Sequence, residues 1–522
     1  MLNIWLKKYL PVWLLGSTVV LSLYFVFYQS LYRGGLWGDE LSLTNSYFRD
    51  WLLLLKPLEG HQVAPVLMVF IEKFLLICAD ITSGSPDVWL RVYPLFCSIG
   101  IMGLYYPTLY RYTKIPALAL FSTMFLLFAP YFVYYSSEVK QYIGELFATV
   151  LLLFVYSFKD DSKKFLYLFC GTVLYCVLTT HIICFVLLPL GLWDTWQLLR
   201  KYNFAWKKML TAPDVRLYVV RYTLCLLFLV GYYFLFLYDH PNKDFMNTWW
   251  EKYFLTGQNG HYLLKKLLTS MFAPEKWLCW AFYAGIFSLL LFKNKFLFVF
   301  TIGMLGGHLL FSYWGFYPVR DRLVLYWYPV ISLVFGSLVY WCIKIPFCLL
   351  LQKRADVLIT LTGCLIIICF WLENSYRLPV VAHRSSDKFI LEEMSKDFGE
   401  NDLSLMQDRG FGRYAEMYYW TSKNKFRHED FWGRTHNPLW DAIKTDDKDK
   451  SLLPLTQKVI DYAFLNRDYE KYDRLWLAVM SDNPDAVQRK INAWIERKNS
   501  GQILEKCKVS PPDTVLCAVR QR

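Results

Sequence analysis

The chain has 522 residues, of which 56% are hydrophobic, 19% aromatic and only 19% charged. Its mean hydropathy is +0.27, and apolar runs of about 20 residues recur from Leu10 to Leu372. Soluble globular chains carry about 25% charged residues, and membrane β-barrels are built from ~10-residue alternating segments, which this sequence lacks. The composition therefore excludes a soluble enzyme, a disordered chain and a barrel, and it indicates a helical membrane protein with several spans.

Eleven apolar segments predict membrane-spanning helices. They lie near residues 10–28, 88–110, 115–133, 139–157, 165–181, 182–199, 217–238, 277–292, 296–314, 323–342 and 355–373. A twelfth stretch, Val63–Ala79, is at the lower length limit for a span and carries Glu72 and Lys73 in its middle. A charge in mid-bilayer costs at least about 2.5 kcal/mol. We therefore expect this stretch to lie in the interface, among juxtamembrane helices of the first outer loop.

Loop charge sets the orientation. If Val63–Ala79 does not cross and the N-terminus is cytoplasmic, the inner segments hold 17 basic residues in 51 positions and the outer segments hold 11 in 110. The positive-inside rule favours this arrangement. The net charge of +13 also lies mostly in residues 1–373, because residues 374–522 hold 25 Lys/Arg and 23 Asp/Glu. Membrane topology explains that excess more simply than a nucleic-acid partner.

The sequence divides into a membrane domain, residues 1–373, and an outer soluble domain, residues 374–522. The second domain reads as mixed α and β. The expected elements are strands at Asp402–Gln407 and Leu475–Met480, helices at Phe411–Trp420 and Asp485–Lys498, and a hairpin of Ile503–Val509 with Thr514–Val519. Cys507 and Cys517 lie on the two arms of this hairpin, either as a disulfide or as two free thiols.

The first outer loop places two adjacent carboxylates, Asp39 and Glu40, after Trp37 and just beyond the first span. A carboxylate at the membrane surface can take a proton from an acceptor hydroxyl. The alternative is a solvated helix N-terminus, where acidic residues are favourable.

Three further outer segments carry charge. Glu138 and Lys140 stand at the mouth of the fourth span, with Tyr142 one helical turn beyond Glu138; snorkelling explains them equally well. Arg320 and Arg322 precede the tenth span, where guanidinium groups suit either a phosphate or lipid headgroups. The loop 239–276 contains Asp239-His240, Trp249-Trp250 and Lys265-Lys266, as a lid or as a plain interfacial helix.

No cofactor motif is visible in the sequence. It contains neither G-x-G-x-x-G nor G-x-x-x-x-G-K-[ST], the motifs that cradle nucleotide phosphates. Its histidines show no metal-ligand spacing. A divalent metal held by Asp39 or Glu40 with the distant His61 or His240 stays open as an alternative.

Four ordered motifs resemble those of the GT-C glycosyltransferases. They are Trp37-Gly38-Asp39-Glu40, His61-x-x-x-Pro65, Leu90-Arg91-Val92-Tyr93-Pro94 and Ser137-Glu138-x-Lys140-x-Tyr142. They are most similar to the polyprenyl-phosphate-sugar-dependent group that includes protein O-mannosyltransferases (family 39) and lipid A aminoarabinose transferases. The resemblance covers residues 30–160 well and weakens toward the arginines before the tenth span.

The resemblance implies a GT-C fold and an inverting sugar transfer at the outer face of a bacterial inner membrane, with a periplasmic C-terminal domain. It implies Asp39 as catalytic base, Glu40 as its neighbour, and Glu138 as a further catalytic carboxylate. The implied donor-phosphate ligands are Arg320, Arg322, Lys265 and Lys140, and the implied substrate contacts are Trp37, His61, Tyr142 and Arg91.

This chain departs from the family at two motifs. Lys140 stands where the group often has arginine, which keeps the charge but loses the fork geometry. His61-Gln62-Val63-Ala64-Pro65 replaces His-Pro-Pro. The acceptor stays open among protein, lipid A and another glycan, as does the sugar. The alternative functions are a flippase for lipid-linked sugars, which would predict internal repeats, and a non-catalytic scaffold for envelope assembly.

Overall fold

The structure is a computed structural model. It describes residues 2–32, 35–36, 38–58, 62–205, 209, 211–241, 243–255, 262, 277–351, 355–374, 402–406, 474–480, 489, 492, 503–510 and 514–520. The chain divides into two compact units: Met1–Tyr32 with Asp50–Val380, and Arg33–Arg49 with Val381–Arg522. Each unit is described by itself.

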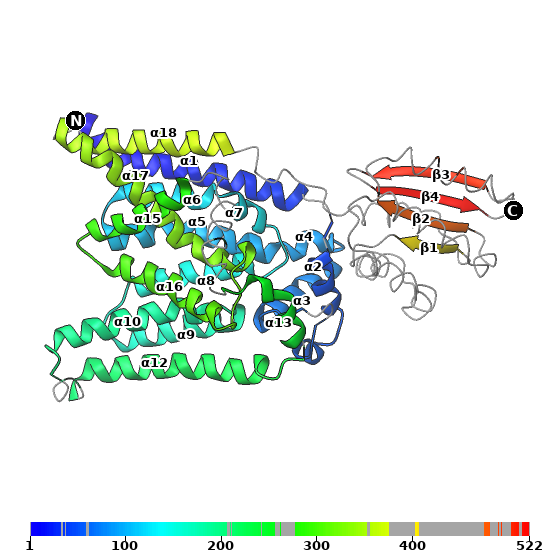
Figure 1. The fold of residues 1–522 in the computed structure, drawn as a ribbon, viewed down its shortest axis with the longest axis horizontal. Helices are drawn as coiled ribbons and strands as arrows, with labels where there is room; N and C mark the ends of the chain where they lie inside the picture. The colour runs from blue at the N-terminus through cyan, green and yellow to red at the C-terminus, as the bar shows by residue number, and fades with distance from the viewer. Residues whose placement is uncertain are drawn as a thin grey trace. The chain divides into compact units, whose positions relative to one another are not determined.

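The first unit is a bundle of helices that run mostly along one direction (Figure 1). Its helices in chain order are α1 (Leu2–Tyr32), η1 (Trp51–Leu55), α3 (Val66–Thr82), α4 (Pro86–Leu90), α5 (Val92–Thr113), α6 (Pro116–Leu127), α7 (Pro130–Tyr135), α8 (Tyr142–Tyr156), α9 (Lys163–Thr179), α10 (Ile183–Lys201), α12 (Pro213–Tyr232), η3 (Tyr233–Leu237), α13 (Lys243–Trp250), η4 (Glu251–Tyr253), α15 (Trp277–Ser288), η5 (Leu289–Leu291), α16 (Phe296–Tyr313), η6 (Asp321–Trp327), α17 (Tyr328–Leu351) and α18 (Ala355–Asn374).

The bundle is that of a multi-pass membrane protein. Five helical segments of the described chain are long and apolar enough to cross a bilayer: Tyr9–Leu31, Pro86–Thr113, Pro213–Leu237, Phe296–Tyr313 and Arg322–Phe347. Four shorter apolar helices accompany them, at Pro116–Leu127, Tyr142–Tyr156, Leu278–Leu291 and Asp356–Leu372. Each of the eleven predicted spans falls on helix, while the number of crossings and their direction remain predictions.

Helix breaks within the predicted spans have local causes. The segment predicted at 115–133 divides into α6 and α7 at Phe128 and Ala129, directly before Pro130. A residue before proline is disfavoured in the α conformation, so the first helix ends there and Pro130 opens the next. The segment predicted at 323–342 likewise begins as the 3-10 helix η6 and becomes α-helical at Tyr328.

Small residues allow the central helices to approach closely. α6 packs against α17, and a Cβ atom added to Gly336 would lie only 2.7 Å from the backbone nitrogen of Ser122. Close backbone approach is how membrane helices gain packing without a hydrophobic driving force. The α6–α17 contact is therefore specified by the absence of a side chain at position 336.

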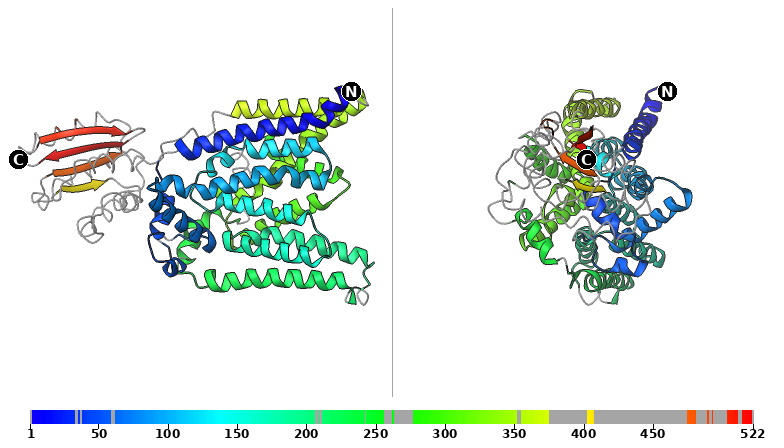
Figure 2. Two further views of the ribbon diagram at one scale, coloured as in Figure 1. Left: turned by 180° about the vertical axis from the view of Figure 1, so that it is seen from behind. Right: turned by 90° about the vertical axis from the view of Figure 1, so that its right-hand side faces the viewer.

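The stretch predicted to lie in the interface forms α3. Glu72 points inward and is fully buried, whereas the Lys73 ammonium lies over the Trp51 ring of η1 at 5.3 Å. Figures 1 and 2 place α3, α4 and α13 at the end of the bundle opposite the N-terminus. We call this the loop end of the first unit.

A buried acidic residue joins helices near the other end of the bundle. Asp194 of α10 accepts hydrogen bonds from Tyr156 of α8 and, at 3.0 Å, from Tyr222 of α12. It also pairs with Lys159 at 2.5 Å and with Arg221 at 3.4 Å. Two cations and two hydroxyls thus satisfy one carboxylate that is 1% exposed.

The second unit contains α2 (Gly38–Ser46) and a four-stranded sheet in the order β1-β2-β4-β3. The strands are β1 (Asp402–Met406), β2 (Arg474–Met480), β3 (Ile503–Ser510) and β4 (Thr514–Arg520), within one residue of the predicted bounds. β1 pairs with β2 in parallel, and the other pairs are antiparallel. Cys507 and Cys517 are direct cross-strand partners in the register. The predicted helix Phe411–Trp420 lies outside the described residues, and so does Asp485–Lys498 apart from Arg489 and Asn492.

Candidate functional site

The adjacent carboxylates that follow α1 in the sequence open a short helix. Asp39 and Glu40 form the first turn of α2 in the second unit, where acidic side chains interact favourably with the helix dipole. Glu40 is fully buried and Asp39 is half-buried. The Ser42 hydroxyl donates to the Asp39 backbone carbonyl at 3.1 Å. The Asp39 side chain is the more accessible of the two carboxylates.

Glu138 and Lys140 lie in the turn between α7 and α8, and both are buried, with 2% and 3% exposure. The Lys140 ammonium donates a 2.6 Å hydrogen bond to the side-chain oxygen of Gln62. Gln62 belongs to the motif His61-x-x-x-Pro65, and Lys140 belongs to the motif that begins at Ser137. The hydrogen bond therefore joins these two motifs across 78 residues of sequence. A buried ammonium on this turn supplies positive charge at low dielectric.

Arg320 and Arg322 lie over aromatic rings at the loop end. The Arg320 guanidinium is 5.3 Å from the ring centre of Trp250 and 4.6 Å from that of Tyr253. The Arg322 guanidinium is 5.3 Å from the same Trp250 ring and 5.9 Å from the Tyr142 ring. The structure therefore brings together three of the predicted residues: both arginines and Tyr142.

The backbone around the arginines is held from two sides. The Val319 amide donates to the Tyr253 carbonyl at 2.9 Å, which joins this segment to η4. The second contact comes from α16, where His308 Nε2 lies 3.2 Å from the Pro318 carbonyl and His308 Nδ1 lies 2.6 Å from the Tyr326 hydroxyl. Because a carbonyl only accepts, Nε2 carries the proton, and the Tyr326 hydroxyl donates to Nδ1. We call Pro318–Arg322 the arginine loop.

A buried carboxylate that the sequence analysis did not single out lies close to the arginine loop. Glu145 is one helical turn after Tyr142 on α8 and is fully buried. Burial first, and the nearby Glu145 carboxyl second, raise the pKa of Tyr317 well above its ordinary value. An apolar run surrounds Glu145 in the sequence, and only its helical spacing from Tyr142 could have indicated its position.

Arg91 has a structural partner. It is 2% exposed, and its Nη1 donates to the Ser30 carbonyl at the end of α1 at 3.3 Å. This bond ties the last turn of α1 to the start of α5, as a cation near a helix C-terminus does. A substrate contact of Arg91 stays a prediction.

The remaining predicted residues do not join a cluster. Trp37, His61 and Lys265 lie outside the described residues. His240 is half-buried in the turn after η3, and burial lowers its pKa. Among the described residues, no group of three or more His, Cys, Asp or Glu side chains could hold a metal ion. Because His61 lies outside the described residues, a metal held by Asp39 or Glu40 with His61 or His240 stays a prediction.

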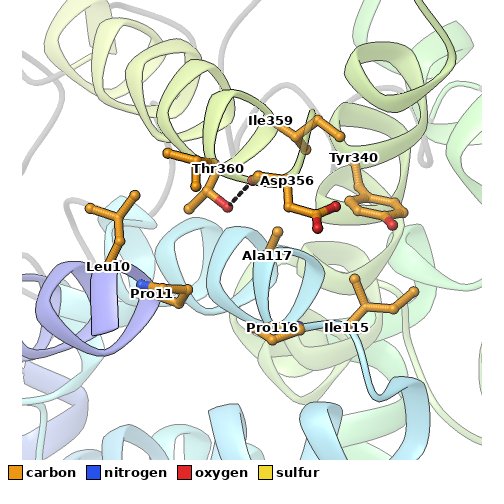
Figure 3. A pocket seen from close by; sticks show the side chains of 10 residues that line it. Leu10, Pro11, Ile115, Pro116, Ala117, Tyr340, Asp356, Ile359 and Thr360 are labelled. Carbon is orange, nitrogen blue, oxygen red and sulfur yellow. Dashed lines mark hydrogen bonds between the residues drawn. The ribbon is translucent and has the colours of Figure 1, made fainter. Parts of the chain in front are cut away.

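One cavity of about 140 Å³ lies far from these residues. It is lined by α1, α6, α17 and α18, mainly by apolar side chains such as Leu10 and Ile359. Figure 3 shows the Asp356 carboxylate and the Tyr340 ring beside it. None of the predicted site residues lines this cavity.

Comparison with solved structures gives the fold. Over 96% of this chain and 97% of the other, the structure matches that of ArnT from Cupriavidus metallidurans bound to undecaprenyl phosphate, with a TM-score of 0.50 and 11% identity. The apo state of the same protein matches over the same shares, with a TM-score of 0.50 and 10% identity. The chain has the GT-C fold. The fold prediction made from the four motifs is thereby confirmed.

A third similar structure is that of the archaeal oligosaccharyltransferase AglB from Archaeoglobus fulgidus in complex with an inhibitory peptide and a dolichol-phosphate. It matches at a TM-score of 0.48 and 13% identity, over 98% of this chain and 74% of that chain. No protein-family profile matches this chain, and no curated protein sequence matches it.

Proposed function

We propose that the chain is an integral-membrane glycosyltransferase that moves a sugar from a polyprenyl-phosphate donor to an acceptor at the outer face of a bacterial inner membrane. The observation that carries the proposal is the pair of guanidinium groups, Arg320 and Arg322, gathered at the loop end of a GT-C bundle. The similar ArnT structure was solved bound to undecaprenyl phosphate. Guanidinium groups bind phosphate oxygens through paired hydrogen bonds.

The proposed reaction is a single displacement. The acceptor oxygen attacks the anomeric carbon, the bond from that carbon to the phosphate oxygen breaks, and the electron pair leaves with the polyprenyl phosphate. One displacement inverts the anomeric centre. The leaving phosphate needs little acid assistance, so the protein's task is to neutralise its charge and to position the acceptor.

Asp39 is the proposed base that takes the acceptor proton, with Glu40 beside it in the sequence and Glu138 as the next candidate. Support for Asp39 comes from the motif resemblance and from its position on the first turn of α2. Arg320, Arg322, Lys140 and Lys265 are the proposed ligands of the donor phosphate. Trp37, His61, Arg91 and Tyr142 are proposed substrate contacts, and the acceptor is a protein, lipid A or another glycan.

The test is a transfer assay with radiolabelled polyprenyl-phosphate sugars and a membrane extract as the source of acceptors. Asp39→Asn should lower transfer by 100-fold or more, since a positioned base contributes about 10²–10⁴-fold. Asp50→Asn is the matched control, because Asp50 is an exposed carboxylate of the same outer loop; it should transfer normally. Normal transfer by Asp39→Asn would remove Asp39 from the mechanism. Absence of transfer with any donor by the wild-type protein would contradict the proposed activity.

A further inference from the structure

We infer that Trp250 is a positioning residue for the donor phosphate: its indole ring seats both Arg320 and Arg322. The inference rests on the proposed function, because it adds a residue to the proposed phosphate site. We call Trp250 and its two arginines the indole seat.

In the indole seat, one ring contacts both guanidinium groups. Each guanidinium carbon lies 5.3 Å from the centre of the Trp250 ring, within the ~6 Å range of a cation–π contact. Trp250 is 7% exposed, whereas its neighbour Trp249 is 58% exposed. Of two adjacent tryptophans at the end of α13, one is therefore built into the fold and the other faces outward.

The electrostatics explain why such a support is needed. Two guanidinium groups that share one ring repel each other, and the repulsion is strong in a partly buried site. Tryptophan has the most favourable ring for cations, with contacts of ~0.5–2 kcal/mol each. The Trp250 ring therefore offsets part of the repulsion through its π system. A guanidinium group binds an anion such as phosphate through the N–H donors at its edge, which a ring contact does not require.

The segment that carries Trp250 is fixed to the bundle. The Val319 amide donates to the Tyr253 carbonyl at 2.9 Å, and the Leu255 amide donates to the Ser312 hydroxyl at 3.0 Å. Arg320 also contacts the Tyr253 ring at 4.6 Å. The position of both arginines thus depends on the docking of residues 243–255, a segment whose sequence alone favours a plain interfacial helix.

The experiment measures binding of undecaprenyl phosphate to the full chain in detergent, together with KM and kcat for a polyprenyl-phosphate sugar. Trp250→Leu should weaken binding about tenfold and raise KM for the donor by a similar factor, with kcat changed far less. Trp250→Phe keeps a ring face and should bind within about threefold of the wild type. Trp249→Leu, the matched control, should bind normally. A general loss of structure would not produce this KM-specific pattern with rescue by phenylalanine.

Tyr253→Leu provides a second variant in case Trp250→Leu does not fold. It removes only one ring from Arg320, and a smaller loss of affinity than for Trp250→Leu is expected. The double variant Arg320→Gln/Arg322→Gln tests the proposed phosphate site separately from the role of Trp250. If the double variant loses binding while Trp250→Leu and Tyr253→Leu bind normally, the indole seat is wrong and the phosphate site stands. If the double variant binds as the wild type does, the proposed phosphate site itself is wrong.

Discussion

At the residue scale, a hydrogen bond joins the buried charge of Lys140 to a side chain that is distant in the sequence. Its ammonium is 3% exposed and donates to the Gln62 side-chain oxygen at 2.6 Å. Such hydrogen bonds between a charged and a neutral group contribute about 1.5–3 kcal/mol each. The hydrogen bond between Lys140 and Gln62 therefore also stabilises the folded protein.

Gln62→Leu should lower the free energy of unfolding by about 1–3 kcal/mol, because it removes an acceptor from a buried ammonium. Gln62→Glu is the matched variant, since a carboxylate offers Lys140 a charge-assisted bond at the same place; its stability should equal or exceed that of the wild type. Thermal unfolding in detergent measures both. Equal unfolding of the leucine variant and the wild type would show that this bond contributes nothing.

The arginine loop depends on a second buried hydrogen-bonded pair. Tyr326→Phe removes the hydroxyl that donates to His308 Nδ1, and His308 Nε2 holds the Pro318 carbonyl. We expect a stability loss of about 1–3 kcal/mol and a severalfold rise in KM for the donor, because a buried nitrogen loses its partner. Tyr313→Phe, on α16 with His308, is the control, as Tyr313 is 61% exposed. An unchanged KM in Tyr326→Phe would contradict the positioning of the loop through His308.

At the scale of helices, charge burial decides which ion pairs matter. Asp194 of α10 pairs with Arg221 of α12 and with Lys159 in the turn after α8, and the Arg221 and Asp194 side chains are 3% and 1% exposed. The pair of Lys201 with Asp214 has a similar distance, 2.7 Å, but its lysine side chain is 55% exposed. The pair of Asp194 with Arg221 is buried, whereas solvent largely screens the pair of Lys201 with Asp214.

Asp194→Asn should therefore destabilise the protein by about 3–5 kcal/mol, because it removes the buried carboxylate that pairs with the buried guanidinium of Arg221. Asp214→Asn should cost at most about 1 kcal/mol. Thermal unfolding of the two variants side by side gives the comparison. Similar losses in both variants would show that burial does not separate the two pairs.

The sequence predicted elements better than contacts. Apolar run length places every predicted span on helix, and short apolar or alternating runs place all four strands, since these patterns are local. The shared contact of Arg320 and Arg322 with Trp250 joins residues 70 positions apart in the chain, and no local pattern distinguishes Trp250 from Trp249. The motif predicts a substrate contact for Arg91, whereas its bond to the Ser30 carbonyl arises only when α1 packs beside α5 and has no local pattern.

At the scale of the whole molecule, the charge distribution predicts the orientation. The inner segments carry 17 basic residues in 51 positions, so the N-terminus should be cytoplasmic and residues 374–522 should be periplasmic. Alkaline phosphatase fused after Arg522 should be active, and the same fusion after Ser162 should be inactive. The reverse pattern would place the proposed site on the cytoplasmic side and would contradict the account of the donor.

The central claim is that a GT-C chain transfers a sugar from a polyprenyl phosphate at the outer membrane face. The most direct measurement uses membrane vesicles of both orientations and a short-chain, membrane-impermeant polyprenyl-phosphate sugar with a labelled sugar. Transfer of label to an acceptor should occur in right-side-out vesicles and be abolished by Asp39→Asn but not by Asp50→Asn. Transfer confined to inverted vesicles, or movement of a lipid-linked sugar across the membrane without any transfer, would contradict the claim.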